Sequence, residues 1–189
     1  MRARYLDPEE VARIEEKARG ADVLRVAELT GLRVGDVVKI RVADLDEDGV
    51  RYVAEKTGKP GRAPLPPALV ARLRKGAKYG WVFPSPRKPR RHITRQAIWA
   101  RVKRASERAA IPPAGVSPHS LRKTYAVEKF KTEGIEAVRR ALQHGDRRTT
   151  EIYALSDWST GENADLPLLR RDLPLIIEKI VSALSEGID

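Results

Sequence analysis

The sequence predicts an α+β fold, mostly α-helical, with a small three-stranded antiparallel β-sheet. Helical apolar spacing recurs along most of the chain, and three short strand-like segments lie between residues 50 and 83. The 189 residues suit one domain, and a hydrophobic content of 41% supports a buried core. The sequence has no signal-like start, no bilayer-length apolar run and no cysteine. We therefore expect a cytoplasmic protein without membrane contact.

The first third of the chain is predicted to be helical. Asp7 followed by Pro8 and two acids is typical of a helix start, and the apolar stripe of this helix comprises Val11, Ile14 and Ala18. A second helix runs from about residue 23 to Gly31. We expect residues 33–45 to form a further short helix.

The middle of the chain combines strands with two helices. Residues 50–54 and 62–66 predict strands of a hairpin whose turn carries the letters EKTGKPG, and residues 80–83 predict the third strand. A proline-initiated helix separates the last two strands. Thr94 is a good N-cap for a basic helix, whose predicted buried residues are Ile98, Val102, Ala105 and Ala109.

The last third predicts helices over residues 118–132 and 135–143, and a further helix carrying Tyr153. A polar linker and a final apolar helix follow. The chain holds one Asn, two Gln, one Met and no Cys. Such a shortage of thermolabile residues is typical of hyperthermophile proteins, with a GC-rich genome as the alternative explanation.

The formal net charge of +11 favours a polyanionic partner. Most of the excess lies in residues 87–108, where nine Lys or Arg residues stand against one acid. This segment lacks the apolar face with interfacial aromatics that a membrane surface requires, which favours nucleic acid. Three scattered histidines and no cysteine predict neither a metal site nor another cofactor.

Four separated motifs form a constellation: TGLRVGD, EKTGK, HSLRKTYA and LQHGDRRTTEIY. Single motifs of this kind occur by chance, because H-x-x-R also describes an ordinary surface pair. In this order and spacing, however, residues 7–156 resemble the catalytic domain of the tyrosine recombinases, the family of phage integrases and of the Xer and Cre recombinases. The resemblance implies that family's fold and double-stranded DNA as the partner.

The resemblance also assigns roles that suit the chemistry. Without a metal, guanidinium groups are a natural clamp for the anionic transition state of a phosphodiester, a role for Arg33 and Arg122. His144 and His119 would donate to the phosphate, and His119 has the alternative role of accepting the phenol proton. Tyr153 would be the nucleophile, which leaves a 3′-phosphotyrosyl enzyme.

Two further residues support this site. Lys56, in the hairpin turn, would protonate the leaving 5′-oxygen, and it is favoured over the nearby Lys59. Asp36 occupies the family's acidic position, where we expect it to brace the site. The predicted DNA-backbone contacts are Arg87, Lys88, Arg90, Arg91, Arg95, Arg101, Lys103 and Arg104, together with Trp99. Arg147 and Arg148 either steer the DNA backbone or simply solvate a turn.

These expectations predict a site-specific DNA recombinase or integrase that needs neither metal nor ATP. The alternatives are a nicking and resealing enzyme of the type IB topoisomerase or relaxase kind, and a DNA-binding protein that kept the fold. Residues 1–156 would be the catalytic domain, without the usual N-terminal DNA-clamping domain. The chain would then be either a catalytic fragment or a reduced enzyme that recruits an accessory DNA-binding protein or domain for grip. In residues 157–189 the final helix would pack on a neighbouring subunit of a dimer or tetramer, or on its own core.

Overall fold

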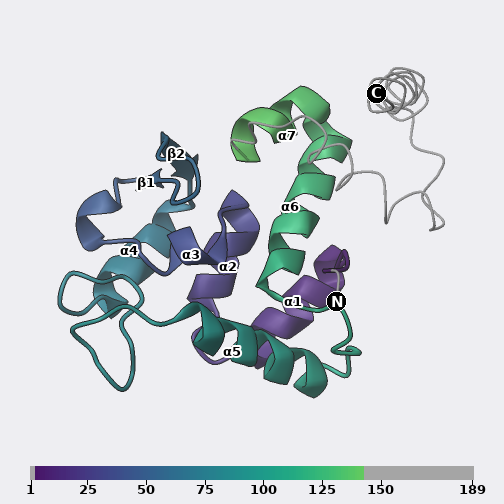
Figure 1. The fold of residues 1–189 in the computed structure, drawn as a ribbon, viewed down its shortest axis with the longest axis horizontal. Coiled ribbons are helices and arrows are strands. Elements are labelled where there is room, and N and C mark those ends of the chain that lie inside the picture. The colour runs from purple at the N-terminus through teal and green to yellow at the C-terminus, as the bar shows by residue number, and fades with distance from the viewer. Residues whose placement is uncertain (1–2, 143–189) are drawn as a thin grey trace, which may run out of the picture. The chain divides into compact units, whose positions relative to one another are not determined.

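The structure is a computed structural model that describes residues 3–142. The chain divides into two compact units, Met1–Tyr125 and Ala126–Asp189, with the boundary inside one helix. The first unit contains, in order, α1 (Pro8–Lys17), α2 (Asp22–Thr30), α3 (Val34–Val37), the 3₁₀ turn η1 (Val42–Asp44), β1 (Gly49–Val53), β2 (Pro60–Pro64), α4 (Pro67–Gly76), α5 (Arg95–Arg108) and the start of α6 (Pro118–Glu133) (Figure 1). The second contains the rest of α6 and α7 (Ile135–Leu142).

The predicted helix start at Asp7 is confirmed. The Asp7 carboxylate accepts from the backbone N–H of Glu10 (2.7 Å), and the Glu10 carboxylate accepts from the backbone N–H of Asp7 (3.3 Å). α2 ends at Gly31, whose φ of 64° lies in the left-handed region that favours glycine. This reversal directs the chain into Arg33, the N-cap residue of α3.

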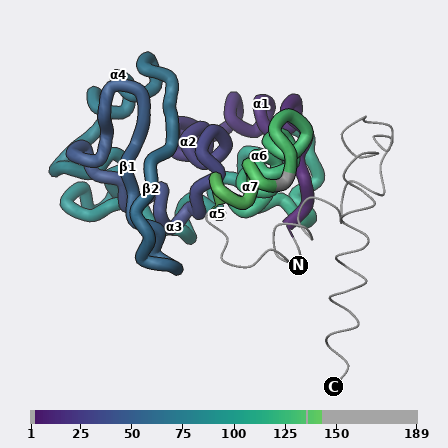
Figure 2. Tube along the Cα trace, turned by 90° about the horizontal axis from the view of Figure 1, so that it is seen from above, coloured from purple at the N-terminus to yellow at the C-terminus, as the bar shows by residue number. Residues whose placement is uncertain are grey.

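The predicted hairpin is also confirmed, although its second strand begins earlier than expected. β1 and β2 lie side by side (Figure 2) and are antiparallel, and in their register Val50 is opposite Ala63 and Arg51 is opposite Arg62. Val50 and Ala63 face the core, whereas both arginines are exposed. The connecting turn is closed by the backbone N–H of Ala54 donating to the carbonyl of Lys59 (2.9 Å). One end of the hairpin therefore presents a compact turn that carries Lys56.

Residues 33–45 do not form the single helix that we expected. α3 and η1 are separated by a turn at residues 38–39 and a short stretch that pairs with residues 80–82: Val42 N–H donates to the carbonyl of Gly80 (3.1 Å), and Val82 N–H donates to the carbonyl of Ile40 (3.1 Å). These tertiary hydrogen bonds compete with helical ones, and sequence periodicity carries no sign of them.

The prediction of a third strand is wrong, because the described residues form a sheet of only two strands. Trp81 makes isolated bridges with Arg41 and Lys78 instead. A tight turn with left-handed Tyr79 and Gly80 precedes Trp81, and Pro84, which has no N–H, follows soon after. The segment is therefore too short for a continuous ladder.

The core of the first unit joins its helices to the hairpin. Thr94 caps α5 by accepting from the N–H of Ala97 (3.1 Å), and the four apolar α5 positions predicted as core are all buried. α5 packs on α1 (Figure 1). Leu6 exchanges two hydrogen bonds with Thr124 Oγ1, at 3.2 and 2.7 Å, which ties the N-terminal segment to the start of α6. Within residues 3–142 no helix has the length and apolar character that crossing a membrane would require.

The described part of the second unit is helical, as predicted. Six apolar residues on α6 and α7 are buried, namely Ala126, Val127, Phe130, Ala137, Val138 and Leu142. Lys129 pairs with Glu133 one turn later (2.6 Å). The predicted helix around Tyr153 and the final helix lie outside the described residues.

Candidate active site

The junction between α2 and α3 presents Arg33. This half-buried residue follows the left-handed Gly31 by two positions, so the direction of its backbone depends on that turn. Among residues 3–142 the Arg33 side chain makes no hydrogen bond or ion pair. A guanidinium held at a fixed backbone position without a protein partner is available for an anionic ligand.

Arg122 reaches the same junction from α6. It is 6% exposed, and its Nη1 donates a hydrogen bond to the backbone carbonyl of Gly31. These two residues are 91 positions apart in the chain. One guanidinium edge is therefore used to join α6 to the end of α2, which places Arg122 beside the TGLR motif that carries Arg33.

His119 lies one turn before Arg122 on α6, and its ring is accessible to solvent. Partial burial lowers the pKa of His119 below its ordinary value, and the positive charges of Arg122 and Arg33 lower it further. These effects favour the neutral imidazole, in which one ring nitrogen is able to accept a proton. The structure thus brings together three of the predicted site residues from two distant segments.

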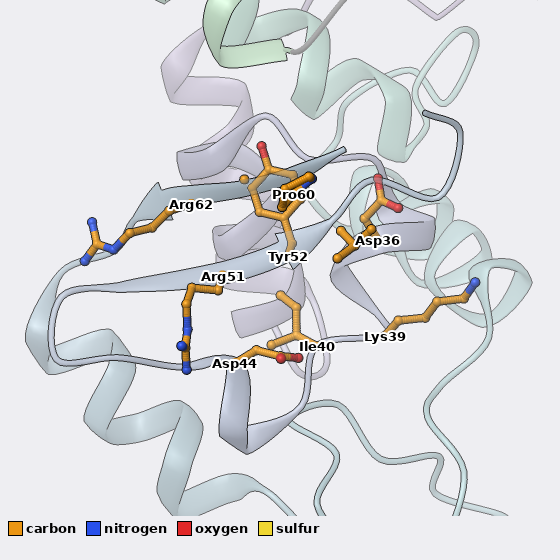
Figure 3. Close-up of a pocket in the computed structure, with 10 residues that line it drawn as sticks. Asp36, Lys39, Ile40, Asp44, Arg51, Tyr52, Pro60 and Arg62 are labelled. Atoms are coloured by element: carbon orange, nitrogen blue, oxygen red, sulfur yellow. The ribbon is translucent and has the colours of Figure 1, made fainter. Parts of the chain in front are cut away.

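Asp36 connects α3 to the hairpin turn. It is buried, and its Oδ1 accepts from the backbone N–H of Glu55 (2.9 Å). Glu55 directly precedes Lys56, so this bond fixes the base of the turn that carries the predicted acid. Lys56 and the competing Lys59 are both exposed. Asp36 also borders an open groove of about 840 Å³ along the hairpin (Figure 3).

Tyr52 borders the site, although the sequence reading assigned it only to the strand. Burial raises its pKa; the charge of Arg122 lowers it, whereas that of Asp36 raises it. Tyr52 stands opposite Gly61 in the hairpin register and is labelled beside Asp36 in Figure 3. The sequence did contain a signal for Tyr52, because an aromatic residue opposite a glycine on the inward face of a hairpin is unusual enough to single out.

The basic segment does not form one surface. Arg87, Lys88, Arg90 and Arg91 lie exposed on a loop, whereas the remaining members lie on α5. Arg95, Trp99 and Lys103 recur every four residues and share one face of that helix. Arg101 and Arg104 lie on another face. Burial lowers the pKa of Arg101, and its Nη1 lies so close to Gly20 that a Cβ there would be only 2.9 Å away. A single DNA backbone laid along α5 cannot contact both faces.

The face of α5 with Arg95 and Trp99 is the one next to His119. A cavity of about 560 Å³ is lined there by side chains of α5 and the start of α6, with Val34 from α3. Trp99 is 51% exposed, and the Lys103 ammonium lies 5.4 Å from its ring centre. A cationic and aromatic face beside the predicted phosphate ligands suits a nucleic acid strand.

The other predicted site residues, His144 and Tyr153, lie outside the described residues, as do Arg147, Arg148 and the segment 157–189. In the part of the chain that the structure describes, no group of three or more His, Asp or Glu side chains is arranged to hold a metal ion.

Comparison with known proteins extends these observations. The model of the phage integrase family matches residues 4–159. Tyrosine recombinase XerD of Rhizobium meliloti (strain 1021) is 31% identical over 149 residues, which cover 72% of this chain and 47% of XerD. XerA recombinase has a similar structure, with a TM-score of 0.72 and 23% identity over 93% of this chain and 65% of that one. A lambda integrase dimer bound to a COC′ core site gives a TM-score of 0.71 and 18% identity over 85% of this chain and 50% of that one.

These likenesses differ in what they establish. At such identities the solved structures establish the fold, in agreement with the predicted fold class apart from its third strand. The chain spans about half the length of the curated relatives that it matches. The family match, in contrast, covers most of this chain and contains all four motifs quoted above. The chain therefore belongs to the phage integrase family.

Proposed function

We propose that this protein is a site-specific DNA recombinase that cleaves and rejoins double-stranded DNA through a covalent 3′-phosphotyrosyl intermediate. The observation that carries the proposal is the convergence of Arg33, His119 and Arg122, with Arg122 anchored on the Gly31 carbonyl. Two guanidinium groups and an imidazole at one place provide several donors to the oxygens of a phosphodiester.

In the proposed reaction the phenol oxygen of Tyr153 attacks the phosphorus, and the bond from phosphorus to the 5′-oxygen breaks. The phenol proton passes to His119, whose lowered pKa favours the neutral ring. The departing oxygen takes a proton from Lys56, whose turn is fixed by the bond from Glu55 to Asp36. The reverse attack by a 5′-hydroxyl of another duplex then completes strand exchange. The ester retains the energy of the broken bond, so that rejoining requires no ATP.

The same proposal covers the partners and the domains. Residues 1–156 act as the catalytic domain on double-stranded DNA, while residues 157–189 form a linker and a helix that packs on a neighbouring subunit. The lambda integrase relative, which is a dimer bound to its COC′ core site, supports both DNA binding and assembly. Action on chromosomal or phage DNA implies work in the cytoplasm.

A nicked duplex from which the short cleaved strand diffuses away tests the nucleophile. Wild-type protein is expected to form an SDS-stable adduct with DNA taken from the gene's own neighbourhood. Tyr153→Phe should abolish the adduct, whereas Tyr79→Phe, which alters an exposed tyrosine far along the chain, should retain it. Absence of any wild-type adduct, or persistence of the adduct in Tyr153→Phe, would reject the proposed chemistry.

Two further measurements separate the remaining alternatives. Exchange of flanking DNA between two plasmid-borne sites identifies recombination, whereas relaxation without exchange identifies a nicking and resealing enzyme.

A substrate with sulfur in place of the bridging 5′-oxygen has a leaving group that needs no proton. This substrate should restore cleavage by Lys56→Met, while Lys59→Met should cleave the ordinary substrate at the wild-type rate.

A further inference from the structure

Glu55 is an acidic residue in the turn that carries Lys56, and it makes two contacts with the segment around α3. Its backbone N–H donates to Asp36, while its carboxylate pairs with the Lys39 ammonium at 2.9 Å. Figure 3 shows Asp36 and Lys39 projecting beside the hairpin from this neighbouring segment. The backbone contact depends on the position of the turn alone, whereas the carboxylate contact depends on charge.

The surroundings of this carboxylate are positively charged. The hydrogen bond from Lys39 and its charge lower the pKa of Glu55 below its ordinary value, and Arg95 and His92 lower it further. Gly35 leaves open the space in which these groups meet: a Cβ at that position would lie 3.2 Å from Glu55 Oε2 and 3.7 Å from Arg95 Nη1. The Glu55 carboxylate thus lies near two cations, Lys39 just after α3 and Arg95 on α5.

This arrangement is open to a ligand. The side chains of Lys39 and Glu55 are 48% and 52% exposed. Arg95 continues from here along the α5 face that carries Trp99 and borders the cavity at His119. A DNA strand that reaches the predicted phosphate ligands would therefore bring a neighbouring backbone phosphate close to Glu55, where two negative charges oppose each other.

We propose that Lys39 and Arg95 form a binding site for a DNA backbone phosphate, and that the carboxylate of Glu55 occupies this site until DNA displaces it. The site is separate from the scissile phosphate and its ligands, and the inference rests on the proposed function only in taking DNA as the ligand. Displacement removes the charge contact of the Lys56 turn and leaves the backbone bond to Asp36. DNA docking thereby loosens the turn at the moment when Lys56 must reach the leaving oxygen.

A purely bracing role for Glu55 makes the opposite prediction. If the pair with Lys39 served only to hold the turn, Glu55→Gln would leave DNA affinity unchanged or reduce it. If the carboxylate competes with a phosphate, the same substitution removes the competitor and affinity rises. The sign of the change in affinity therefore distinguishes the two roles.

The test measures binding of a fluorescently labelled duplex by fluorescence anisotropy over a range of salt concentrations. Glu55→Gln should tighten binding by about three- to tenfold at low salt. For this variant the slope of log affinity against log salt concentration should become steeper by up to about 0.9, the value for one added phosphate contact. Glu47→Gln is the matched control, because it removes the same charge at the far end of the same strand.

Double substitutions identify the site itself. A protein with both Lys39→Met and Arg95→Met should bind DNA more weakly. In that background Glu55→Gln should increase DNA affinity no more than Glu47→Gln does. Equal effects of the two glutamate substitutions in the wild-type background, or a full gain from Glu55→Gln without both cations, would overturn the proposal. Circular dichroism verifies that each exposed substitution leaves the fold intact.

These results do not depend on catalysis. If no covalent adduct forms but Glu55→Gln still tightens binding through Lys39 and Arg95, the proposed reaction fails and the phosphate site stands. If the adduct forms normally and the affinity of Glu55→Gln matches that of Glu47→Gln, the phosphate site fails and the proposed reaction stands.

Discussion

Arg33 and Arg122 share a proposed role on the phosphate, yet the structure predicts different consequences when each is replaced by glutamine. Arg122 is buried and donates to the Gly31 carbonyl, itself buried at the end of α2. Arg33 has no side-chain partner within residues 3–142. Both substitutions should reduce the rate of adduct formation, but only Arg122→Gln should cost substantial stability.

The magnitudes follow from these contacts. Loss of one preorganised donor to a transition-state oxygen typically lowers the rate by about 10²–10³-fold. A buried carbonyl left without its donor costs about 1–3 kcal/mol, which corresponds to a fall in Tm of roughly 2–12 °C for a domain of this size. Arg33→Gln should change the free energy of unfolding by no more than about 0.5 kcal/mol.

The assay combines urea unfolding with single-turnover adduct formation, measured well below the unfolding temperature so that both variants are folded. Arg72→Gln, which removes an exposed arginine paired with Asp22 on α2, is the control for loss of a surface charge. Equal stability of Arg33→Gln and Arg122→Gln would refute the anchoring of Arg122 on Gly31. A wild-type rate in Arg33→Gln would refute its assignment as a phosphate ligand.

Other predictions concern pH and the backbone. Burial raises the pKa of Glu15 to about 7, and nearby Glu28 also raises it, so the stability from its protonated form is fully present below about pH 4.5 and is lost as pH rises through 7. Glu15→Gln should therefore increase the free energy of unfolding at pH 7.5 by about 1–2 kcal/mol and flatten the urea-derived pH profile between those limits. NMR titration should give His119 a pKa below 6.5, and Arg33→Gln should raise that pKa. An unchanged pKa in Arg33→Gln would show that the charge of Arg33 does not act on the His119 ring. Gly31→Ala should cost about 1–2 kcal/mol in urea unfolding, because φ is 64° there, and no cost would contradict that conformation.

Local chemistry explains which parts of the fold could be predicted from the sequence. The helix starts at Asp7 and Thr94 depend on side chains that cap their own helix, and the structure contains both caps. The third strand failed for a different reason. Trp81 has strand-like neighbours, but its backbone partner is Arg41, 40 residues earlier, and the pairing stops after one bridge. A pattern within a few residues cannot reveal the length of such a ladder.

The candidate site shows the same contrast between local signals, which the sequence reveals, and contacts between distant residues, which it does not. Motif order was sufficient to select Arg33, His119 and Arg122, which the structure brings together. It could not reveal that Arg122 is held by a carbonyl 91 positions away, or that Glu55 pairs with Lys39. Charge counting grouped Arg101 with Arg95, although helical geometry separates them. Composition reports how much charge a segment holds, whereas only the fold determines which face presents it.

The contacts that assemble this site come from two buried side chains, one of which, Arg122, is also proposed to bind the phosphate. The buried Arg122 donates a hydrogen bond from its guanidinium to the carbonyl of Gly31. The buried Asp36 accepts a hydrogen bond from the N–H of Glu55 with one carboxylate oxygen. In contrast, Arg33 is half-buried and Lys56 is exposed, and neither side chain makes a hydrogen bond or ion pair within residues 3–142. Repulsion between Arg33 and Arg122, which both act on His119, is relieved when an anion binds, so DNA would supply the final ordering of the site. The exposed Glu55 carboxylate has the same effect on Lys39 and Arg95 before DNA arrives, which explains why an acidic residue is compatible with a turn that must later approach a phosphate.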